Sequence, residues 1–437
     1  MADEQALDEV VRFTSDLIRI DTTNRGGGDC QERPAAEYAA ALLAETGLEP
    51  VLLERTKGRT NVVARLEGTD PSADALLVHG HLDVVPAQAE DWSVHPFSGE
   101  IRDGVVWGRG AVDMKNMDAM ILAVVRGWAR LGVRPRRDLV IAFTADEEAS
   151  AEDGSGFLAD RHPELFEGCT EGISESGAFT FHDGGGREIY PIAAGERGTG
   201  WLKLTARGRA GHGSKVNRDN AVTHLAAAIA RIGSHEWPIR ITPTVRAALT
   251  ELAALYGVDA DLDDPGDVDE LLRKLGPAAA LVEATVRNSA NPTMLSAGYK
   301  VNVIPGEAVA YVDGRHLPGT EDEFRATLDH LTGPDVRWEF DHREVALQAP
   351  VDSVTYRRMR AAVEEFAPGG HVVPYCMSGG TDAKQFSRLG ITGYGFAPLK
   401  LPEGFDYQAL FHGVDERVPV EALHFGVRVL DRFLRTA

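Results

Sequence analysis

The sequence contains only three cysteines, Cys30, Cys169 and Cys376, in 437 residues. Three cysteines cannot form a disulfide framework, and their spacing does not match a zinc ribbon. Such sparse cysteine usage is typical of a protein that works in a reducing compartment. We therefore expect a cytoplasmic protein.

Basic residues and long apolar runs are also scarce. There are 45 lysines and arginines against 67 aspartates and glutamates, which gives a net charge of −22 at pH 7. This balance argues against binding to a nucleic-acid backbone. No run reaches the roughly 18 apolar residues of a membrane span, and the acidic, amphipathic N-terminus does not read as a signal peptide. The sequence predicts no nucleic-acid partner and no membrane partner.

What is present fits an α/β protein of two or three domains. The run DLVIAF at 138–143 is short and continuously apolar, which is typical of a strand buried on both faces. Segments with helical spacing alternate with such strands. Helices are expected at 3–18, 35–45 and 117–131, and strands at 61–66, 75–78 and 138–143.

The pattern changes after Gly198, where WLKLTA at 201–206 alternates as a half-buried strand does. Further elements are expected as helices at 220–232 and 321–331, as strands at 302–312 and 336–340, and as partly helical structure in the acidic stretch 239–293. A strand-helix-strand-strand-helix-strand unit explains this order better than a continued parallel sheet. We predict one domain from 1–197 and 347–437, interrupted by an α+β domain at 198–346 with a four-stranded antiparallel sheet and two helices.

The first group of chemically active residues is His79-Gly80-His81-Leu82-Asp83, directly after a predicted strand. Residues two apart in an extended segment share a face, so His79, His81 and Asp83 are expected to point the same way. A carboxylate beside an imidazole can fix its tautomer, as it does for metal ligands. A surface turn with incidental histidines would explain the same residues.

Two further groups of charged residues lie next to expected helices or strands. Asp113 stands after Gly108-Arg109-Gly110, just before a helix; this glycine pattern is too short for a phosphate loop, and Asp113 could equally cap the helix. Glu147 and Glu148 follow Asp146 after the buried strand, where α/β sheets bind ligands. One glutamate could bind a metal while the other faces substrate, although a solvated acidic turn is the alternative.

Two isolated residues complete the set. Glu175 and His412 stand alone, and single residues of these types are more often structural than ligands. No short metal signature such as His-Glu-x-x-His is present. The residues by themselves indicate a soluble α/β protein with candidate carboxylate and histidine clusters.

Together these segments resemble one superfamily of two-metal hydrolases. It comprises aminoacylases, acetylornithine deacetylase, succinyl-diaminopimelate desuccinylase and glutamate carboxypeptidase. The resembling segments occur in the family's order along nearly the whole chain: HGHLDVVP (79–86), DGVVWGRGAVDMK (103–115), TADEE (144–148), RAGHGS (209–214), NVIPGEA (302–308), DGRHLPG (313–319), SGGTDA (378–383) and FHGVDERVP (411–419). Any one of them is weak, but eight in order are specific.

The resemblance implies a catalytic domain with a mixed, mostly parallel sheet flanked by helices, and two divalent metal ions. By the family pattern, His81 and Glu175 bind one ion, Glu148 and His412 bind the other, and Asp113 bridges them. Oxygen and imidazole ligands suit zinc, with cobalt or manganese as alternatives.

The resemblance also assigns roles beyond the ligands. Asp83 would hold His81, and Glu147 would be the general acid-base that activates a metal-bridging water. The inserted domain would be a lid and dimerisation domain, which implies a homodimer. Its His212 would stabilise the oxyanion, typically across the dimer.

Substrate-binding residues follow from the same resemblance. Asn302 and Arg315 would hold the free carboxylate of the substrate, for which an arginine fork is suited. Gly379 and Gly380 would present backbone amides to the substrate.

The predicted function is hydrolysis of the amide bond of N-acyl amino acids or short peptides that bear a free carboxylate. A dipeptidase or carboxypeptidase of the same superfamily is the alternative. A non-catalytic metal or peptide binder is less favoured, because neither Glu147 nor any ligand is lost. A two-metal phosphoesterase would need a cation-lined phosphate site, for which the chain offers mainly Arg109 and Arg315.

Overall fold

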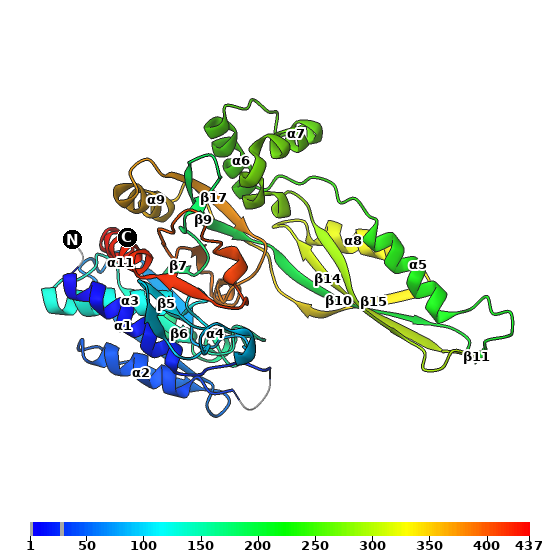
Figure 1. Cartoon of the computed structure of the whole chain (residues 1–437), viewed down its shortest axis with the longest axis horizontal. Helices are drawn as coiled ribbons and strands as arrows, with labels where there is room; N and C mark the ends of the chain where they lie inside the picture. Colours follow the sequence, from blue (N-terminus) through cyan, green and yellow to red (C-terminus); the bar gives the residue numbers. More distant parts are fainter. Residues whose placement is uncertain (1–2, 27–29) are drawn as a thin grey trace. The chain divides into compact units, whose positions relative to one another are not determined.

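The computed structural model describes residues 3–26 and 30–437; residues 1–2 and 27–29, within the predicted first domain, lie outside the described part. The chain divides into two compact units. The first comprises residues 1–194, 349–375 and 381–437, and the second comprises residues 195–348 and 376–380. Figure 1 shows the elements of each unit along the chain.

The first unit is built on a mixed sheet. Its order is β1-β2-β6-β3-β7-β18-β9-β16, with β8 and β17 also paired to β9; the last two residues of β9, the last two of β17 and all of β16 belong to the second unit. The central strands β6, β3, β7 and β18 are parallel, whereas β1, β2, β9 and β16 are antiparallel to their neighbours. The strands are β1 (Val51–Glu54), β2 (Thr60–Leu66), β3 (Ala75–His81), β6 (Leu139–Thr144), β7 (Cys169–Ser174), β8 (Phe181–His182), β9 (Glu188–Glu196), β16 (Leu347–Gln348), β17 (His371–Met377) and β18 (Thr392–Gly395).

Helices cover both faces of this sheet, which explains why β3 and β6 are buried along their whole length. On one face, Leu76, Val78 and Ile141 join the core formed with α1, α2, α3, α9 and α11. On the other face, Leu77 and Val140 pack with residues of α4 and α10. The helices are α1 (Glu4–Arg19), α2 (Arg33–Ala44), α3 (Lys115–Leu131), α4 (Ser155–Arg161), α9 (Val354–Phe366), α10 (Ala383–Phe386) and α11 (Val420–Thr436).

The parallel order of β6, β3 and β7 brings the ends of three strands to one edge. His81 is the last residue of β3 and pairs with Thr144, the last residue of β6. Glu147 follows β6, and Glu175 follows β7. Because parallel strands end at the same edge, the sheet itself gathers these three side chains.

Close approach of α3 to β3 depends on a glycine. A Cβ atom at Gly80 would meet Asp118 Oδ1 at 2.2 Å and Met114 Cε at 2.8 Å. Only glycine lets the beginning of α3 lie this close to the strand that ends in His81. A small antiparallel sheet of β4 (Glu100–Arg102), β5 (Val105–Trp107) and β19 (Arg417–Pro419) lies in the same unit.

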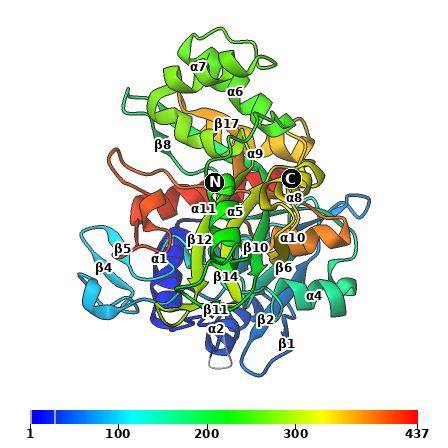
Figure 2. The same ribbon diagram turned by 90° about the vertical axis from the view of Figure 1, so that its right-hand side faces the viewer.

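The second unit is an α+β structure with a four-stranded antiparallel sheet. Its order is β12-β14-β10-β15, and α5 and α8 cover one face over a core that includes Leu204, Leu225, Val312 and Phe324. Figure 2 shows α5 over β12, β14 and β10. The elements are β10 (Gly198–Arg207), β11 (Gly211–His212), α5 (Ala221–Gly233), α6 (Pro243–Tyr256), α7 (Pro265–Leu275), β12 (Ser289–Ala297), β13 (Val303–Ile304), β14 (Glu307–His316), α8 (Glu321–Thr332) and β15 (Val336–Arg343).

The expected fold class is confirmed: a mixed α/β sheet with parallel central strands and a separate four-stranded antiparallel sheet. The strand expected at 302–312 is interrupted, because Pro305 and Gly306 separate β13 from β14. The fourth strand of this sheet, β12, begins inside the stretch 239–293, where only partial helix was expected. Across the described residues, no helix combines the length and apolarity needed to cross a membrane.

Phe143 tests the packing of the central sheet. It is 0% exposed on β6 and belongs to the core formed with α1 and α3. Phe143→Ala should cost about 3–5 kcal/mol, because a buried cavity replaces the ring. The measurement is the urea-unfolding midpoint by circular dichroism, with Leu131→Ala, 52% exposed at the end of α3, as the control. Equal shifts for the two variants would contradict the described core.

Candidate metal centre

Five side chains predicted to bind metal lie together in the first unit. The two carboxylate oxygens of Asp113 face two histidines, with Oδ1 3.2 Å from His81 Nε2 and Oδ2 3.3 Å from His412 Nε2. Glu175 Oε1 lies 3.8 Å from His81 Nε2, and Glu148 Oε2 lies 3.1 Å from His412 Nε2. The side chains therefore form two groups that share Asp113, and potential ligand atoms within each group lie within 4.8 Å of one another.

The five residues come from separate elements. His81 and Glu175 stand at the ends of β3 and β7, and Glu148 lies in the turn after β6. Asp113 lies two residues before the start of α3, whose N-cap is Met114, and His412 lies in the loop before β19. The His81 side chain is 1% exposed, whereas that of His412 is 57% exposed. The centre is thus buried at His81 and open to solvent at His412.

The carboxylates repel one another strongly in this buried setting. Burial raises the carboxyl pKa values of Glu175 and Glu147 well above their usual range, and the neighbouring carboxylates raise both values further. Hydrogen bonds to Asp113 and then Glu148 raise the pKa of His412 to about 10. Burial opposes the charged form of His81, but its hydrogen bond to Asp113 and the nearby Glu175 raise its pKa well above the usual range. Without cations, the centre retains protons that a metal would displace.

The donor set fits divalent cations. It combines carboxylate oxygens with imidazole nitrogens, the ligands of zinc, cobalt and manganese. Glu148 Oε1 is buried and has no hydrogen-bond partner among the described residues. A buried carboxylate oxygen needs a partner, and a cation between Glu148, Asp113 and His412 would supply one.

Glu147 lies beside this set but belongs to neither group of candidate ligands. Its Oε2 atom is 4.0 Å from His81 Nε2, and its side chain is 16% exposed. Glu148 points to His412 instead. The two adjacent glutamates, which lie in a turn, therefore face different parts of the centre.

Asp83 contacts both its expected partner and two residues that were not expected. His81 Nδ1 lies 2.9 Å from the backbone carbonyl of Asp83, whereas the nearest Asp83 carboxylate oxygen is 3.7 Å away. The carboxylate instead accepts the backbone N–H groups of Glu147 at 3.1 Å and Glu148 at 3.0 Å. Asp83 thus fixes the backbone of the two glutamates as well as lying beside His81.

Sequence reasoning missed a buried network behind this turn. Asp146 has a φ of 64° and accepts hydrogen bonds from Arg59 Nη2 at 2.6 Å, Asn24 Nδ2 at 3.2 Å and Ser150 Oγ at 2.7 Å. Asn24 also donates to Asp83 at 2.8 Å. These bonds hold a left-handed residue directly before Glu147. The sequence signal was weak, because Asn24 and Arg59 lie far from 146–148 along the chain.

A second missed residue, Glu416, fixes the segment that carries Asp113. Glu416 is 0% exposed and accepts the backbone N–H groups of Val112 at 2.8 Å and Asp113 at 3.1 Å. Arg109 Nη1 donates to its other oxygen at 2.8 Å. The segments GRGAVD and FHGVDE both appeared in the sequence analysis, but their pairing could not be read from either alone.

His79 takes no part in the centre. It lies on β3 like His81, but its ring packs against Phe386 at 4.9 Å between ring centroids. Burial, followed by the charge of His81, lowers the pKa of His79 to about 3. His79 is therefore a neutral core residue, although it shares the motif with His81.

The predicted lid residues all belong to the second unit. His212 pairs with Val303 between β11 and β13, and Gly213 N donates to Asn302 O at 2.9 Å, so His212 and Asn302 are neighbours. Arg315 Nε donates to Asp313 at 2.7 Å and its Nη1 to Thr199 at 3.1 Å. Gly379 and Gly380 follow β17, and a Cβ atom at Gly379 would meet nothing within 4 Å. The backbone at Gly379 is therefore accessible.

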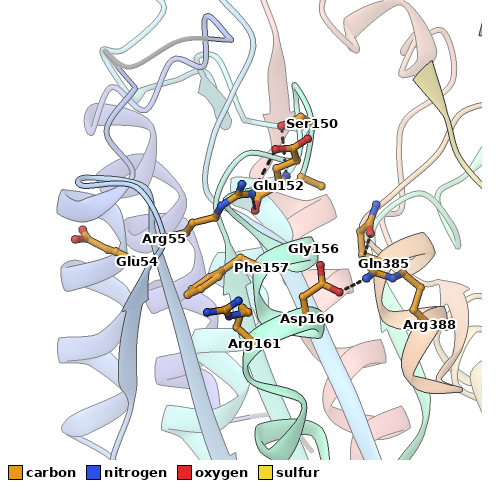
Figure 3. A pocket seen from close by; sticks show the side chains of 11 residues that line it. Glu54, Arg55, Ser150, Glu152, Gly156, Phe157, Asp160, Arg161, Gln385 and Arg388 are labelled. Carbon is orange, nitrogen blue, oxygen red and sulfur yellow. Dashed lines mark hydrogen bonds and ion pairs between the residues drawn. The ribbon is translucent and has the colours of Figure 1, made fainter. Parts of the chain in front are cut away.

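A hollow of about 930 Å³ on the first unit contains none of the predicted site residues. Figure 3 shows its charged side chains, among them Arg55 directed to Glu152 and Arg388 directed to Asp160. Ser150 and Glu152 belong to the turn that follows Glu148. Because most of its charges pair with one another, this hollow offers no concentrated charge for a ligand.

The chain is similar to known proteins. The model of the peptidase family M20/M25/M40 matches residues 77–436. The chain is 31% identical over 391 residues to the human N-fatty-acyl-amino acid synthase/hydrolase PM20D1, covering 85% of this chain and 76% of the relative. It is 26% identical over 426 residues to pig (Sus scrofa) aminoacylase-1, covering 92% and 91%.

Solved structures show the same fold. An M20 family metallo-carboxypeptidase from Sulfolobus solfataricus superposes with a TM-score of 0.72 at 17% identity, covering 98% of this chain and 99% of that one. Human carnosine dipeptidase 1 superposes with a TM-score of 0.66 at 16% identity, covering 99% and 96%.

The buried ion pair of Arg59 and Asp146 predicts a large stability effect. Arg59→Ala leaves the Asp146 carboxylate buried without its counter-charge, and should destabilise the protein by about 3–5 kcal/mol. Arg65→Ala is the matched control, because Arg65 pairs with Asp138 at the surface and is 39% exposed; it should cost at most about 1 kcal/mol. Urea unfolding measures both, and an equally small loss for Arg59→Ala would refute the role of the network.

Proposed function

The chain belongs to the peptidase family M20/M25/M40 and is a hydrolase acting on amide bonds; we propose that it cleaves N-acyl amino acids or short peptides that carry a free carboxylate. The observation that carries the proposal is the position of Asp113 between His81 and His412. A carboxylate facing two imidazoles, each with a further glutamate, suits a two-metal site because it offers one shared ligand and separate nitrogen and oxygen donors on each side.

We propose that the centre holds two divalent cations, zinc in the first place and cobalt or manganese as alternatives. His81 and Glu175 would bind one, Glu148 and His412 the other, and Asp113 would bridge them. When bound, the two ions polarise the substrate carbonyl and lower the pKa of a water molecule. The ligand set supports this proposal because three carboxylates offset most of the charge of two such ions.

Glu147 is proposed as the general acid-base. It lies next to His81 without joining either candidate ligand group, and burial raises the pKa of its carboxyl group. A carboxyl group with a raised pKa can both accept a proton from the attacking water and donate one to the leaving nitrogen. Asp83 supports this role by holding the backbone N–H of Glu147.

The second unit is proposed as the lid and dimerisation domain. We assign residues 198–346 to it, and residues 1–197 and 347–437 to the catalytic domain; the division at 195–348 supports this assignment, although 376–380 group with the second unit. His212 would stabilise the oxyanion, across a homodimer, and Gly379 and Gly380 would offer backbone amides.

Asn302 and Arg315 are proposed to hold the substrate carboxylate. The guanidinium of Arg315 is oriented by Asp313 and Thr199. To hold the substrate carboxylate, two N–H groups of Arg315 would have to face it while the others contact Asp313 and Thr199. We further propose a cytoplasmic location, which the three buried, unpaired cysteines support.

The substrate proposal gives N-acyl amino acids precedence over dipeptides. The relatives found by sequence include proteins named for N-fatty-acyl-amino acids and for aminoacylase activity, and one named as a probable carboxypeptidase. A dipeptidase or carboxypeptidase is the second candidate, because the similar solved structures include proteins named as a metallo-carboxypeptidase and a dipeptidase.

Glu147→Gln separates the acid-base role from metal binding. The variant should keep its metal content and lose about 10²–10⁴-fold in turnover, because only proton transfer is removed. Elemental analysis and amino-acid release measure the two properties. Glu152→Gln, on the exposed part of the same turn with a side chain 70% exposed, is the control and should retain activity. Loss of metal together with activity would instead make Glu147 a ligand.

Metal removal tests the function as a whole. We expect about two metal ions per chain and the release of free amino acids from N-acyl amino acids or dipeptides, abolished by a chelator and restored by zinc, cobalt or manganese. Ninhydrin detection ranks N-acyl amino acids against dipeptides on one panel. Failure of the reconstituted protein to bind any of these metals would rule out the proposal.

A further inference from the structure

A small aromatic pocket lies in the first unit, separate from the candidate ligands. It is formed by residues 179–182 and 404–408 and has a volume of about 240 Å³. Four phenyl or phenol rings line it, those of Phe179, Phe181, Phe405 and Tyr407, together with the imidazole of His182. A cavity of about 150 Å³ already holds benzene, so this one can accept a short acyl chain or an aromatic group. It is smaller than the roughly 300–1,000 Å³ of a complete ligand site, which indicates a subsite.

One wall of the pocket, residues 179–182, is hydrogen-bonded to the segment that precedes the other wall. Thr180 N donates to Leu399 O at 2.9 Å, and Leu401 N donates to Thr180 Oγ1 at 3.0 Å. His182 Nε2 lies 2.8 Å from Leu401 O. These bonds hold the segment after Glu175 against the segment that leads to His412.

The pocket is connected to the candidate metal centre through aromatic contacts. The Tyr407 ring lies 4.7 Å from that of Phe179 and 4.9 Å from that of Phe411, which precedes His412. Tyr407 is 4% exposed. Burial raises the pKa of its phenol well above the usual range, and the carboxylates of Asp113 and then Glu175 raise it further. Tyr407 thus lies within electrostatic reach of both carboxylates.

The residues that line the pocket disfavour the free carboxylate of a substrate. No lysine or arginine lines the pocket, and Asp406 is its only carboxylate. A free substrate carboxylate would meet Asp406 there, and the imidazole of His182 already faces Leu401 O through its Nε2 atom. An apolar chain, in contrast, would be removed from water against the aromatic rings. The chemistry of the pocket therefore selects one end of an N-acyl amino acid.

We propose that this aromatic pocket binds the apolar acyl group of the substrate while the amide bond lies at the candidate metal centre. The inference rests on the proposed amidohydrolase function and deepens it: the substrates are N-acyl amino acids with extended aliphatic or aromatic acyl groups. Phe181 and Phe405, one on each wall, determine acyl specificity.

Two substrate series test the proposal on the metal-loaded protein. The first varies the acyl chain of N-acyl-leucines from acetyl to octanoyl, and the second varies the amino acid at constant acyl group. The value of kcat/KM should rise about fourfold per added methylene until the pocket is filled. Phe405→Asp and, separately, Phe181→Asp should each lower the ratio of octanoyl to acetyl kcat/KM by about tenfold or more, because a carboxylate then lies where the chain binds.

Ratios within one protein cancel any loss of folded enzyme. Ile101→Asp, on a half-exposed residue of β4, is the control and should leave the ratio unchanged. A ratio that Phe405→Asp and Phe181→Asp leave unchanged would overturn the proposal. So would a ratio that depends on the amino-acid side chain instead of the acyl chain.

A binding measurement separates this inference from the proposed function. If neither series is hydrolysed, the proposed function fails, and calorimetry with octanoate then decides whether the pocket exists as a binding site. Binding by the unsubstituted protein that Phe405→Asp abolishes would support the pocket. Equal binding of octanoate by the unsubstituted protein and by Phe405→Asp, or no binding by either, would reject the pocket as a binding site.

Discussion

The concentration of carboxylates around Asp113 is the constraint on which the rest of the first unit depends. Asp113, Glu147, Glu148 and Glu175 share a small, largely buried volume with the imidazoles of His81 and His412. Isolated carboxylates cannot remain ionised in such a place at acceptable cost. The centre must therefore hold either protons or cations. The raised pKa values of Glu147, Glu175 and His412 indicate that these groups bind protons when no cation is present.

Two buried carboxylates outside the ligand set make this concentration possible. Asp83 accepts the backbone N–H groups of Glu147 and Glu148, and Glu416 accepts those of Val112 and Asp113. In both cases backbone N–H groups donate hydrogen bonds to a buried carboxylate. These bonds satisfy the carboxylate without another mobile side chain. Each fixes the course of a loop, so the ligand side chains start from defined backbone positions.

Side-chain hydrogen bonds offset backbone strain beside the centre, at Asp146. Asp146 and His412 have φ values of 64° and 58°, a region that costs a non-glycine residue about 1–3 kcal/mol. Arg59, Asn24 and Ser150 all donate to Asp146 and hold it in that conformation. The strain and the network together direct Glu147 and Glu148 to different parts of the centre.

The sequence predicted those parts of the structure that are encoded locally. The buried strand at 138–143, the helices at the beginning of the chain and the motifs around His81 and Asp113 each carry their signal within a few residues. Glu175 and His412 were too isolated to stand out, and only their order among family-like segments identified them. Asn24, Arg59 and Glu416 could not be predicted, because their meaning depends on partners far along the chain. Likewise, nothing in the motif distinguished His79 from His81, since only packing against Phe386 makes His79 a core residue.

The candidate centre and the aromatic pocket are built from the same two stretches of chain. Glu175 begins one stretch and Phe179 lies further along it, while Phe405 and Tyr407 precede His412 on the other. A shift in either stretch would move a metal ligand and a pocket wall together. Hydrogen bonds between Thr180 and Leu399 and the packed, tilted rings of Phe179 and Tyr407 oppose such a shift. Packing of the pocket therefore contributes to the position of His412, the most exposed of the five candidate ligands.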